Sequence, residues 1–279
     1  MKSTALVLVL ATTCTLAATA AEERCPLIPM GAITGKPDEQ TVKETLEAYK
    51  AVGVDQYLIY PRSGLEYEYM GEEWLRTCEW ICKHAKRLDM SIWLYDEYNW
   101  PSGSCKGRVP AENPDFESRQ YAVYKNADGT FTWDVVHSPG WVDNYSFKAM
   151  ERFIELTHRK YEQRLGPYLG STVKGIFTDE PHRGMVMSAF SGNRDPEWIV
   201  PWTPKLFESF EQRFGYDLVP RLPELFLRAG GHAVSQVKWH YMEHVQQLVL
   251  DHFAKPCDEW CRDHGLVLTG HFLHEDSLT

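Results

Sequence analysis

Residues 173–181 read VKGIFTDEP, and this stretch decides the fold that we expect. Its first part is a short apolar run, which is consistent with a buried β-strand. The run stops on Asp179 and Glu180, so two carboxylates stand at the C-terminal end of a predicted strand. Parallel α/β barrels keep their catalytic side chains at such strand ends.

The same ending occurs at two other places in the chain. Residues 91–97 read SIWLYDE, and residues 266–271 read LVLTGH and lead to Glu275 and Asp276. Strand ends of a parallel barrel meet at one rim. Repeated carboxylates at this rim, with aromatic residues between them, indicate a sugar-cleaving site.

Predicted strands alternate with predicted helices, which is the pattern of a parallel sheet or barrel. We expect five strands, at residues 27–32, 56–60, 91–95, 173–178 and 266–273. We expect helices at residues 39–52, 72–88, 146–165, 204–214, 223–229 and 233–264. The expected fold class is therefore α/β, of the (β/α)8 TIM-barrel type. Because that fold has eight strands, we expect an incomplete barrel, with residues 21–279 as one domain truncated at the C-terminus.

Two long excursions interrupt the alternation, at residues 99–145 and 182–203. The first contains the sequence NADG at residues 126–129, which predicts a β-hairpin. Loops this long inside a compact domain are usually functional.

The composition limits the partners. The chain has 279 residues and a formal net charge of −10, which argues against a nucleic-acid or anionic-membrane partner. The charge does not indicate any particular substrate; the oligosaccharide or polysaccharide that we expect as substrate is inferred from the carboxylates at the predicted strand ends.

The N-terminus has the pattern of an export signal. Lys2 is followed by an apolar stretch at residues 5–16 and by the small residues ATA at 18–20. The stretch is too short to span a membrane, and we expect no membrane span elsewhere. Residues 1–20 are thus a predicted signal peptide, and the mature protein is expected to be secreted or periplasmic.

Six cysteines follow the predicted signal. Two pairs have i, i+4 spacing on predicted helices, and a disulfide at that spacing has poor geometry. We expect buried free thiols, although an exported protein permits disulfides. The six are Cys25, Cys78, Cys82, Cys105, Cys257 and Cys261.

Cleavage of a glycosidic bond needs two carboxyl groups, one on each side of the bond. Glu180 is the expected general acid, since Pro181 stiffens the turn after it and the adjacent Asp179 favours a protonated partner. Glu275, just past the fifth strand, is the expected second carboxylate. His271 lies near it in the sequence and could orient it or bind a sugar hydroxyl.

Other polar and aromatic side chains at the strand ends are expected to bind the sugar. Carboxylates and amides bind hydroxyl groups, and Trp100 could form an apolar wall. Arg62, at the end of the second strand, is a weaker candidate. The expected substrate-binding residues are Asp96, Glu97, Asn99, Trp100, Asp179 and His271.

Several other chemistries have no support. The chain lacks a P-loop, a GxGxxG after a strand, HExxH and GxSxG, the signatures of phosphoryl transfer, dinucleotide binding, zincin proteolysis and the α/β-hydrolase triad. A metal-dependent hydrolase that uses His182, His271 and Asp179 is a remote alternative.

Four segments together resemble the catalytic domain of the bacterial α-L-rhamnosidases of glycoside hydrolase family 106. They are WLYDEYNWPSG at residues 93–103, FTDEP at 177–181, FGYDL at 214–218 and LTGH at 268–271, and the resemblance covers about residues 27–279. It implies a (β/α)8 barrel in an exported multidomain enzyme, and hydrolysis with inversion by a glutamate acid and a glutamate base. By their motifs, Glu180 matches the acid and Glu275 the base.

The resemblance also implies calcium near the sugar hydroxyls. Asp96, Glu97 or Asp179 could supply oxygen ligands, but the sequence does not assign the ion.

Two alternatives stay open. One is a retaining glycosidase on the same barrel, closer to a β-galactosidase. The other is a non-catalytic carbohydrate-binding barrel fragment, which would keep the tryptophan-rich rim.

Overall fold

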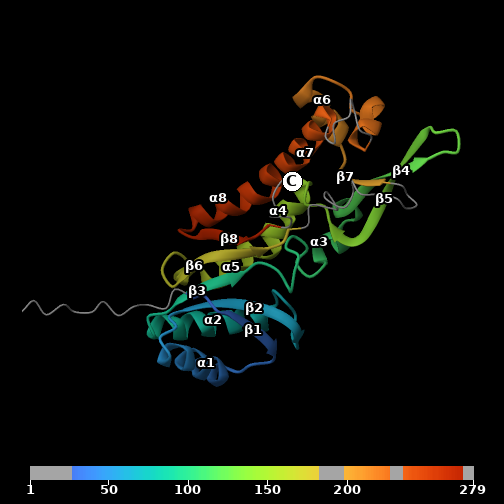
Figure 1. The fold of residues 1–279 in the computed structure, drawn as a ribbon. Coiled ribbons are helices and arrows are strands. Elements are labelled where there is room, and N and C mark those ends of the chain that lie inside the picture. The colour runs from blue at the N-terminus through green and yellow to red at the C-terminus, as the bar shows by residue number, and fades with distance from the viewer. Residues whose placement is uncertain (1–26, 182–197, 227–234, 273–279) are drawn as a thin grey trace, which may run out of the picture.

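A computed structural model describes residues 27–181, 198–226 and 235–272 (Figure 1). The described strands include a five-stranded parallel sheet in which neighbours follow the chain order. Its strands are β1 (Met30–Gly35), β2 (Gln56–Leu65), β3 (Ser91–Tyr95), β6 (Val173–Asp179) and β8 (Val267–His271). The five strands predicted from the apolar runs are confirmed, with shifts of a few residues at their ends. Among the described residues, β1 and β8 are the two edges of the sheet, and no further strand closes it into a barrel.

Helices α1 (Glu39–Ala51) and α2 (Glu72–Arg87) connect the first three strands, as predicted. Asp38 begins α1 by accepting a hydrogen bond from the backbone N–H of Thr41, which satisfies one of the open donors of the first turn. Both helices pack their apolar sides against the sheet, and Leu46, Trp74 and Ile81 are buried there.

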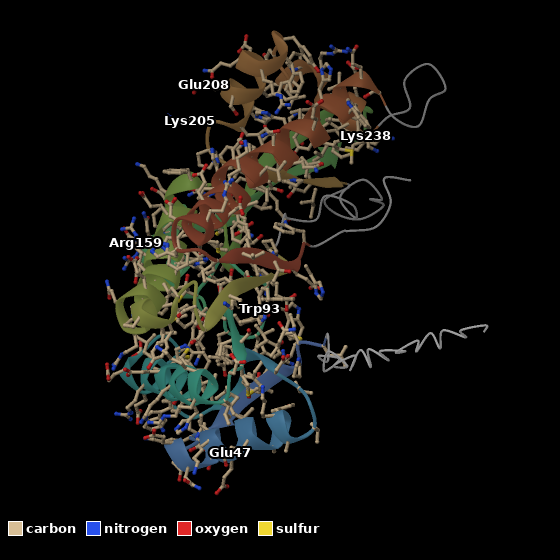
Figure 2. The ribbon with its side chains drawn as sticks, turned by 90° about the vertical axis from the view of Figure 1, so that its left-hand side faces the viewer. Glu47, Trp93, Arg159, Lys205, Glu208 and Lys238 are labelled. Carbon is tan, nitrogen blue, oxygen red and sulfur yellow. The ribbon has the colours of Figure 1, made fainter. Side chains whose placement is uncertain are left out.

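Alternation along the strands separates two faces of the sheet. Ile92 and Leu94 of β3 and Ile176 of β6 are fully buried in the helix-side core. One residue along from these, Trp93 and Phe177 belong to the opposite face and are only partly buried. Trp93 lies near the middle of the molecule in Figure 2.

The first excursion contains α3 (Arg108–Glu112), the 3₁₀ turn η1 (Pro114–Phe116), β4 (Glu117–Lys125) and β5 (Phe131–Val142). The predicted hairpin at residues 126–129 is confirmed, and it projects away from the parallel sheet (Figure 1). The sequence did not predict β7 (Trp198–Trp202), which pairs antiparallel with β4 to complete a three-stranded sheet.

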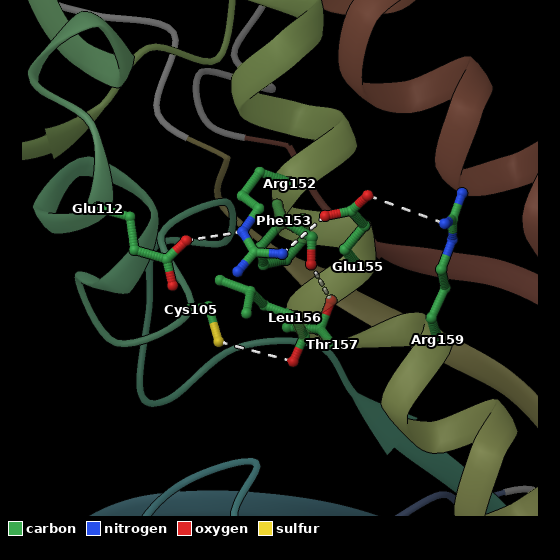
Figure 3. Close-up of polar contacts among 8 residues, drawn as sticks. All are labelled: Cys105, Glu112, Arg152, Phe153, Glu155, Leu156, Thr157 and Arg159. Carbon is green, nitrogen blue, oxygen red and sulfur yellow. Dashed lines mark hydrogen bonds and ion pairs between the residues drawn. The ribbon is translucent and has the colours of Figure 1, made fainter.

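The helix expected at residues 146–165 is interrupted. It forms α4 (Phe147–Leu156) and α5 (His158–Leu165), followed by the 3₁₀ turn η2 (Gly166–Tyr168), with Thr157 between the two helices at φ −121° and ψ −77°. The Thr157 hydroxyl donates to the carbonyl of Phe153 at 2.7 Å (Figure 3). Hydroxyl bonds of this kind compete with the helical ladder and bend helices.

Arg152 of α4 ties the first excursion to the helical layer. Its guanidinium lies 2.7 Å from Glu112 of α3 and 2.7 Å from Glu155 (Figure 3). The thiol of Cys105 also points at the carbonyl of Leu156, 3.9 Å away. The loop after β3 is thereby held against α4.

The last part of the described chain contains α6 (Leu206–Phe214), η4 (Val219–Leu225), α7 (Gln236–Val249), the π-helical turn η5 (Leu250–Ala254) and α8 (Lys255–Asp263). The single helix expected at residues 233–264 is therefore split by η5, and the helix expected from residue 223 is a 3₁₀ turn within its described part. Five cysteines are buried free thiols, as predicted: Cys78, Cys82, Cys105, Cys257 and Cys261. No helix in the described ranges has the length and apolarity that a membrane span needs.

Candidate active site

The C-terminal ends of β2, β3, β6 and β8 meet at one rim of the parallel sheet. A row of rings crosses it. The ring of Tyr95 lies 4.5 Å from that of Tyr60 and 5.8 Å from that of Phe177, and Phe177 lies 5.2 Å from the ring of His271. Side chains from four strands therefore share the face opposite the helices.

Asp179, the last residue of β6, makes polar contacts with two other strands at this rim. Its Oδ2 accepts a hydrogen bond from the Tyr95 hydroxyl at 2.5 Å, and its Oδ1 lies 3.5 Å from Nδ1 of His271. The Asp179 side chain is 13% exposed, and that of His271 is 61% exposed. The structure thus brings together two residues that were predicted to bind the substrate, and that binding role stays a prediction.

The Tyr95 hydroxyl is the donor in the short contact with Asp179, and the backbone carbonyl of Asn99 is a second acceptor for the same proton. Burial, followed by the hydrogen bond to Asp179, raises the pKa of Tyr95. The phenol therefore keeps its proton at neutral pH, and Asp179 receives a hydrogen bond from a neutral group.

Glu180 lies at the point where β6 leaves the sheet. Its backbone N–H donates to the carbonyl of His271 at 2.8 Å, so it is tied to the end of β8. Its φ of +45° is in the left-handed region, which is uncommon for residues other than glycine and is found at functional sites. The residue is partly exposed, and its positive φ ends the strand alternation.

The loop that follows β3 closes over Asp179. Ser102 is fully buried, and its hydroxyl accepts from the backbone N–H of Asp179 at 2.8 Å while its own N–H donates to the Asp179 carbonyl at 2.7 Å. The same hydroxyl donates to Oδ1 of Asp96 at 2.6 Å. Ser102 thus couples the ends of β3 and β6.

Asp96 does not lie on the open face. Its side chain follows Leu94 in the alternation and is fully buried, with Oδ2 lacking a hydrogen-bond partner among the described residues. Burial, followed by the nearby Glu97, raises the pKa of Asp96 to about 8. The structure gives Asp96 a contact with Ser102 in place of the expected contact with a sugar.

Glu97 is also buried, at 1% exposure. Its two oxygens accept hydrogen bonds from the backbone N–H groups of Tyr98, Ser104, Cys105 and Lys106 at 2.6–2.8 Å. Burial raises the pKa of Glu97, and these four donors oppose the rise. Glu97 holds the loop after β3 in shape, and its carboxylate is not accessible to a sugar or to calcium.

Asn99 and Trp100 stand at the edge of the rim. Asn99 accepts from the backbone N–H of Ser63 at 3.0 Å, which joins β2 to the loop after β3. Trp100 is 52% exposed, and the guanidinium of Arg62 lies 5.1 Å from its ring centroid. Trp100 is thus accessible, as a wall of a sugar site requires, and Arg62 beside it is half-buried.

Glu275, the expected second carboxylate, lies outside the described residues, as do His182 and the predicted signal peptide. Within the described ranges, no three His, Cys, Asp or Glu side chains form a metal-binding group. Calcium binding therefore stays a prediction from the sequence resemblance.

Tyr95 and Ser102 were not predicted from the sequence as site residues. The sequence did contain an indication for Tyr95. It is two residues from Trp93, so both side chains lie on the same face of the strand, and it directly precedes the two carboxylates. Ser102 makes its contacts through a loop whose path the sequence does not specify.

Comparisons with known proteins give a fold and no family. No protein-family model matches the chain, and no curated protein matches its sequence. A solved rhamnosidase from Novosphingobium sp. PP1Y superposes with a TM-score of 0.57 at 10% identity, over 90% of this chain and 46% of that chain. A polyextremophilic β-galactosidase from the Antarctic haloarchaeon Halorubrum lacusprofundi gives a TM-score of 0.45 at 14% identity, over 88% of this chain and 36% of that one. The chain spans less than half the length of each, and it shares the fold of one part of the rhamnosidase.

Proposed function

We propose that this chain contributes the catalytic rim of an exported glycoside hydrolase that acts on oligo- or polysaccharides, with an α-L-rhamnoside as its substrate class. The proposal rests above all on Asp179 and Glu180, which the backbone bonds of Ser102 and His271 fix at the C-terminal edge of a parallel sheet. The fold shared with a rhamnosidase supports the class. The motifs quoted above support the specificity.

In this proposal Glu180 is the general acid. It donates its proton to the glycosidic oxygen as the bond from that oxygen to the anomeric carbon breaks. Glu275 is the general base, which takes a proton from the water that attacks the anomeric carbon from the opposite side. The reaction consumes one water molecule. Glu180 loses one proton and Glu275 gains one, and the configuration at the anomeric carbon is inverted.

Asp179 has a binding role in the same scheme. The hydroxyl of Tyr95 and the imidazole of His271 hold its carboxylate in place, and its remaining lone pairs can accept hydrogen bonds from sugar hydroxyls. His271 and Trp100 are the exposed groups beside it. Asp96 and Glu97 have a supporting part, since their oxygens are directed at the protein's own groups.

We also propose that the five strands belong to a (β/α)8 barrel. The support is the sheet face opposite the helices, where Met30 is 44% exposed and Val267 is 57% exposed. Apolar groups at such positions are covered in a closed barrel. Export of the protein is proposed from the N-terminal pattern alone.

Hydrolysis of aryl glycosides tests the function. The chain should release the phenol from an aryl α-L-rhamnoside, and NMR should show the inverted anomer as the first product. The Glu180→Gln variant should lower turnover by roughly 10²–10⁴-fold, the range typical of a lost general acid, and should still bind the sugar. Release of the retained anomer would favour the retaining alternative, and sugar binding without hydrolysis would favour the carbohydrate-binding one.

A further inference from the structure

Two exposed tryptophans from distant parts of the sequence line one cavity beside the rim. Trp100 is 52% exposed and Trp141 is 46% exposed. The cavity, of about 210 Å³, lies between the loop after β3 and the end of β5, and its lining residues are Trp100, Pro101, Ser102, Ser104, Gly140, Trp141 and Val142.

We infer that this cavity is a second sugar subsite, in which the indoles of Trp100 and Trp141 bind the apolar face of a neutral pyranose unit. The inference rests on the proposed function, because the unit would belong to the same saccharide that reaches Asp179. The sequence predicted a role for Trp100 but not for Trp141, and it did not predict the cavity between them.

Both walls of the cavity are held in place. On one side, the guanidinium of Arg62 lies 5.1 Å from the Trp100 ring centroid, and Asn99 is bonded to Ser63. On the other side, the Asp143 carboxylate next to Val142 accepts hydrogen bonds from Tyr145 and Thr203 at 2.9 and 2.7 Å. A ligand that enters would therefore meet aromatic groups that are already ordered, which lowers the entropic cost of binding.

Gly103 brings the two walls together. A Cβ at this position would lie 2.5 Å from Oδ1 of Asn144 and 3.1 Å from Cγ1 of Val142, and the backbone has φ +123°. Only glycine fits this close approach without displacement. The sequence around Gly103 thus determines the separation between the loop of Trp100 and the strand of Trp141.

Ser102 links the cavity to the rim. Ser102 lines the cavity, and its hydroxyl and N–H are bonded to the backbone of Asp179 at 2.8 and 2.7 Å. A ring bound between the tryptophans would therefore lie close to Asp179, to which a sugar-binding role was given above.

The chemistry of the lining selects a sugar ring. Indoles offer a large apolar surface with one polar N–H, and Ser102 and Ser104 are polar residues in the lining. A pyranose has a matching combination of C–H faces and hydroxyl edges. The volume is below the roughly 300–1,000 Å³ of pockets for drug-sized ligands, which suits one ring and not a whole oligosaccharide.

The test compares saccharides of two lengths by calorimetric titration. The probes are tetrasaccharides with α-L-rhamnosyl or β-D-galactosyl units and the corresponding methyl monosaccharides, all titrated into the full chain carrying Glu180→Gln to prevent turnover. Trp141→Ala should weaken tetrasaccharide binding about tenfold, as for loss of an aromatic anchor of about 1.4 kcal/mol, and leave monosaccharide binding unchanged. Trp141→Phe should recover part of the loss. Trp239→Ala is the matched control, because Trp239 of α7 is 55% exposed and does not line the cavity.

Several outcomes would overturn the inference. The first is equal tetrasaccharide affinity in the Trp141→Ala and Trp239→Ala variants. The second is that the parent chain binds no tetrasaccharide. The third is a dimer, detected by light scattering, that Trp141→Ala dissociates. The last result would assign the tryptophans to a contact between copies of the chain.

The same experiment separates the subsite from the proposed function. If the chain hydrolyses aryl glycosides but Trp141→Ala leaves tetrasaccharide affinity unchanged, only the subsite is refuted. If instead tetrasaccharide binding depends on Trp141 while the chain with Glu180 intact hydrolyses no glycoside, the result supports the subsite and refutes the proposed hydrolase function.

Discussion

The hydroxyl of Tyr95 lies 2.5 Å from Oδ2 of Asp179, so the last residue of β3 fixes the carboxylate at the end of β6. Because Tyr95 keeps its proton, this is a neutral donor bonded to a charged acceptor, which is stronger than a bond between two neutral groups.

Tyr95→Phe removes this donor and leaves the ring packing unchanged. A hydrogen bond to a charged group contributes about 1.5–3 kcal/mol, so we expect kcat/KM on an aryl α-L-rhamnoside to fall by roughly ten- to a hundredfold. Steady-state kinetics measure the change, with Tyr124→Phe on the β4–β5 hairpin as the control. Equal kinetics for the two variants would show that the Asp179 carboxylate needs no anchor.

Glu97 provides a second prediction, because its role in the structure differs from the one expected. The N–H groups of Ser104, Cys105 and Lys106 converge on its carboxylate, and Cys105 and Lys106 have φ of +50° and +58°. Successive N–H groups in such conformations form anion-binding concavities. The negative charge of Glu97 is therefore part of the loop's structure.

Glu97→Gln should destabilise the fold by about 2–4 kcal/mol, because an amide NH₂ would face backbone donors and leave buried N–H groups unpaired. Urea denaturation followed by circular dichroism measures the loss. Glu44→Gln on the exposed side of α1 is the control and should change stability by less than about 0.5 kcal/mol. A Glu97→Gln variant that is as stable as the parent, yet binds sugar more weakly, would restore the substrate role predicted for Glu97.

The parts of the fold that depend on local sequence were predictable. Each strand of the parallel sheet is an apolar run, and its hydrophobic pattern is visible without knowledge of its neighbours. The pairing of β7 with β4 joins Trp202 to Arg119, 83 positions apart by their residue numbers, and no local pattern specifies such a contact.

The position of the candidate site at the strand ends was predictable from the sequence. The face of the sheet to which each side chain points was less predictable. Strand parity separates Asp96, which follows the buried Leu94, from Asp179, which follows the half-buried Phe177. Parity alone would have assigned Asp96 to the helix side. The contacts of Glu97 depend on positive φ values in a loop without strand or helix periodicity, so the sequence could not show them.

Gly103 gives a third prediction, on the spacing of the two loops. In Gly103→Ala the new methyl would meet Asn144 at 2.5 Å, whereas at Gly107 a Cβ would meet nothing within 4 Å. Both glycines have positive φ, so the control variant Gly107→Ala costs only about 1 kcal/mol of backbone strain. Gly103→Ala should cost about 1–3 kcal/mol more, as overpacking does.

Thermal unfolding of the two glycine variants measures the difference. The Gly103→Ala variant should also bind the tetrasaccharide more weakly, since the loop of Trp100 must move. Variants of equal stability would contradict the close approach of Gly103 to Asn144.

The buried Asp96 predicts how stability depends on pH. Burial raises its pKa from 3.8 to about 8 in the folded protein, so between these values the folded state keeps a proton that the unfolded state has lost. Stability contributed by Asp96 is therefore complete below about pH 4 and is lost as the pH rises toward 8. Asp96→Asn keeps an acceptor for the Ser102 hydroxyl and cannot ionise, so its unfolding free energy should fall less steeply between pH 5 and pH 8 than that of the parent. Urea denaturation at a series of pH values measures both slopes, and Asp134→Asn on the exposed side of β5 should keep the parent slope. Parallel slopes for Asp96→Asn and the parent would mean that Asp96 is ionised in the folded protein. They would contradict a raised pKa for the Asp96 carboxyl that joins β3 to β6 through Ser102.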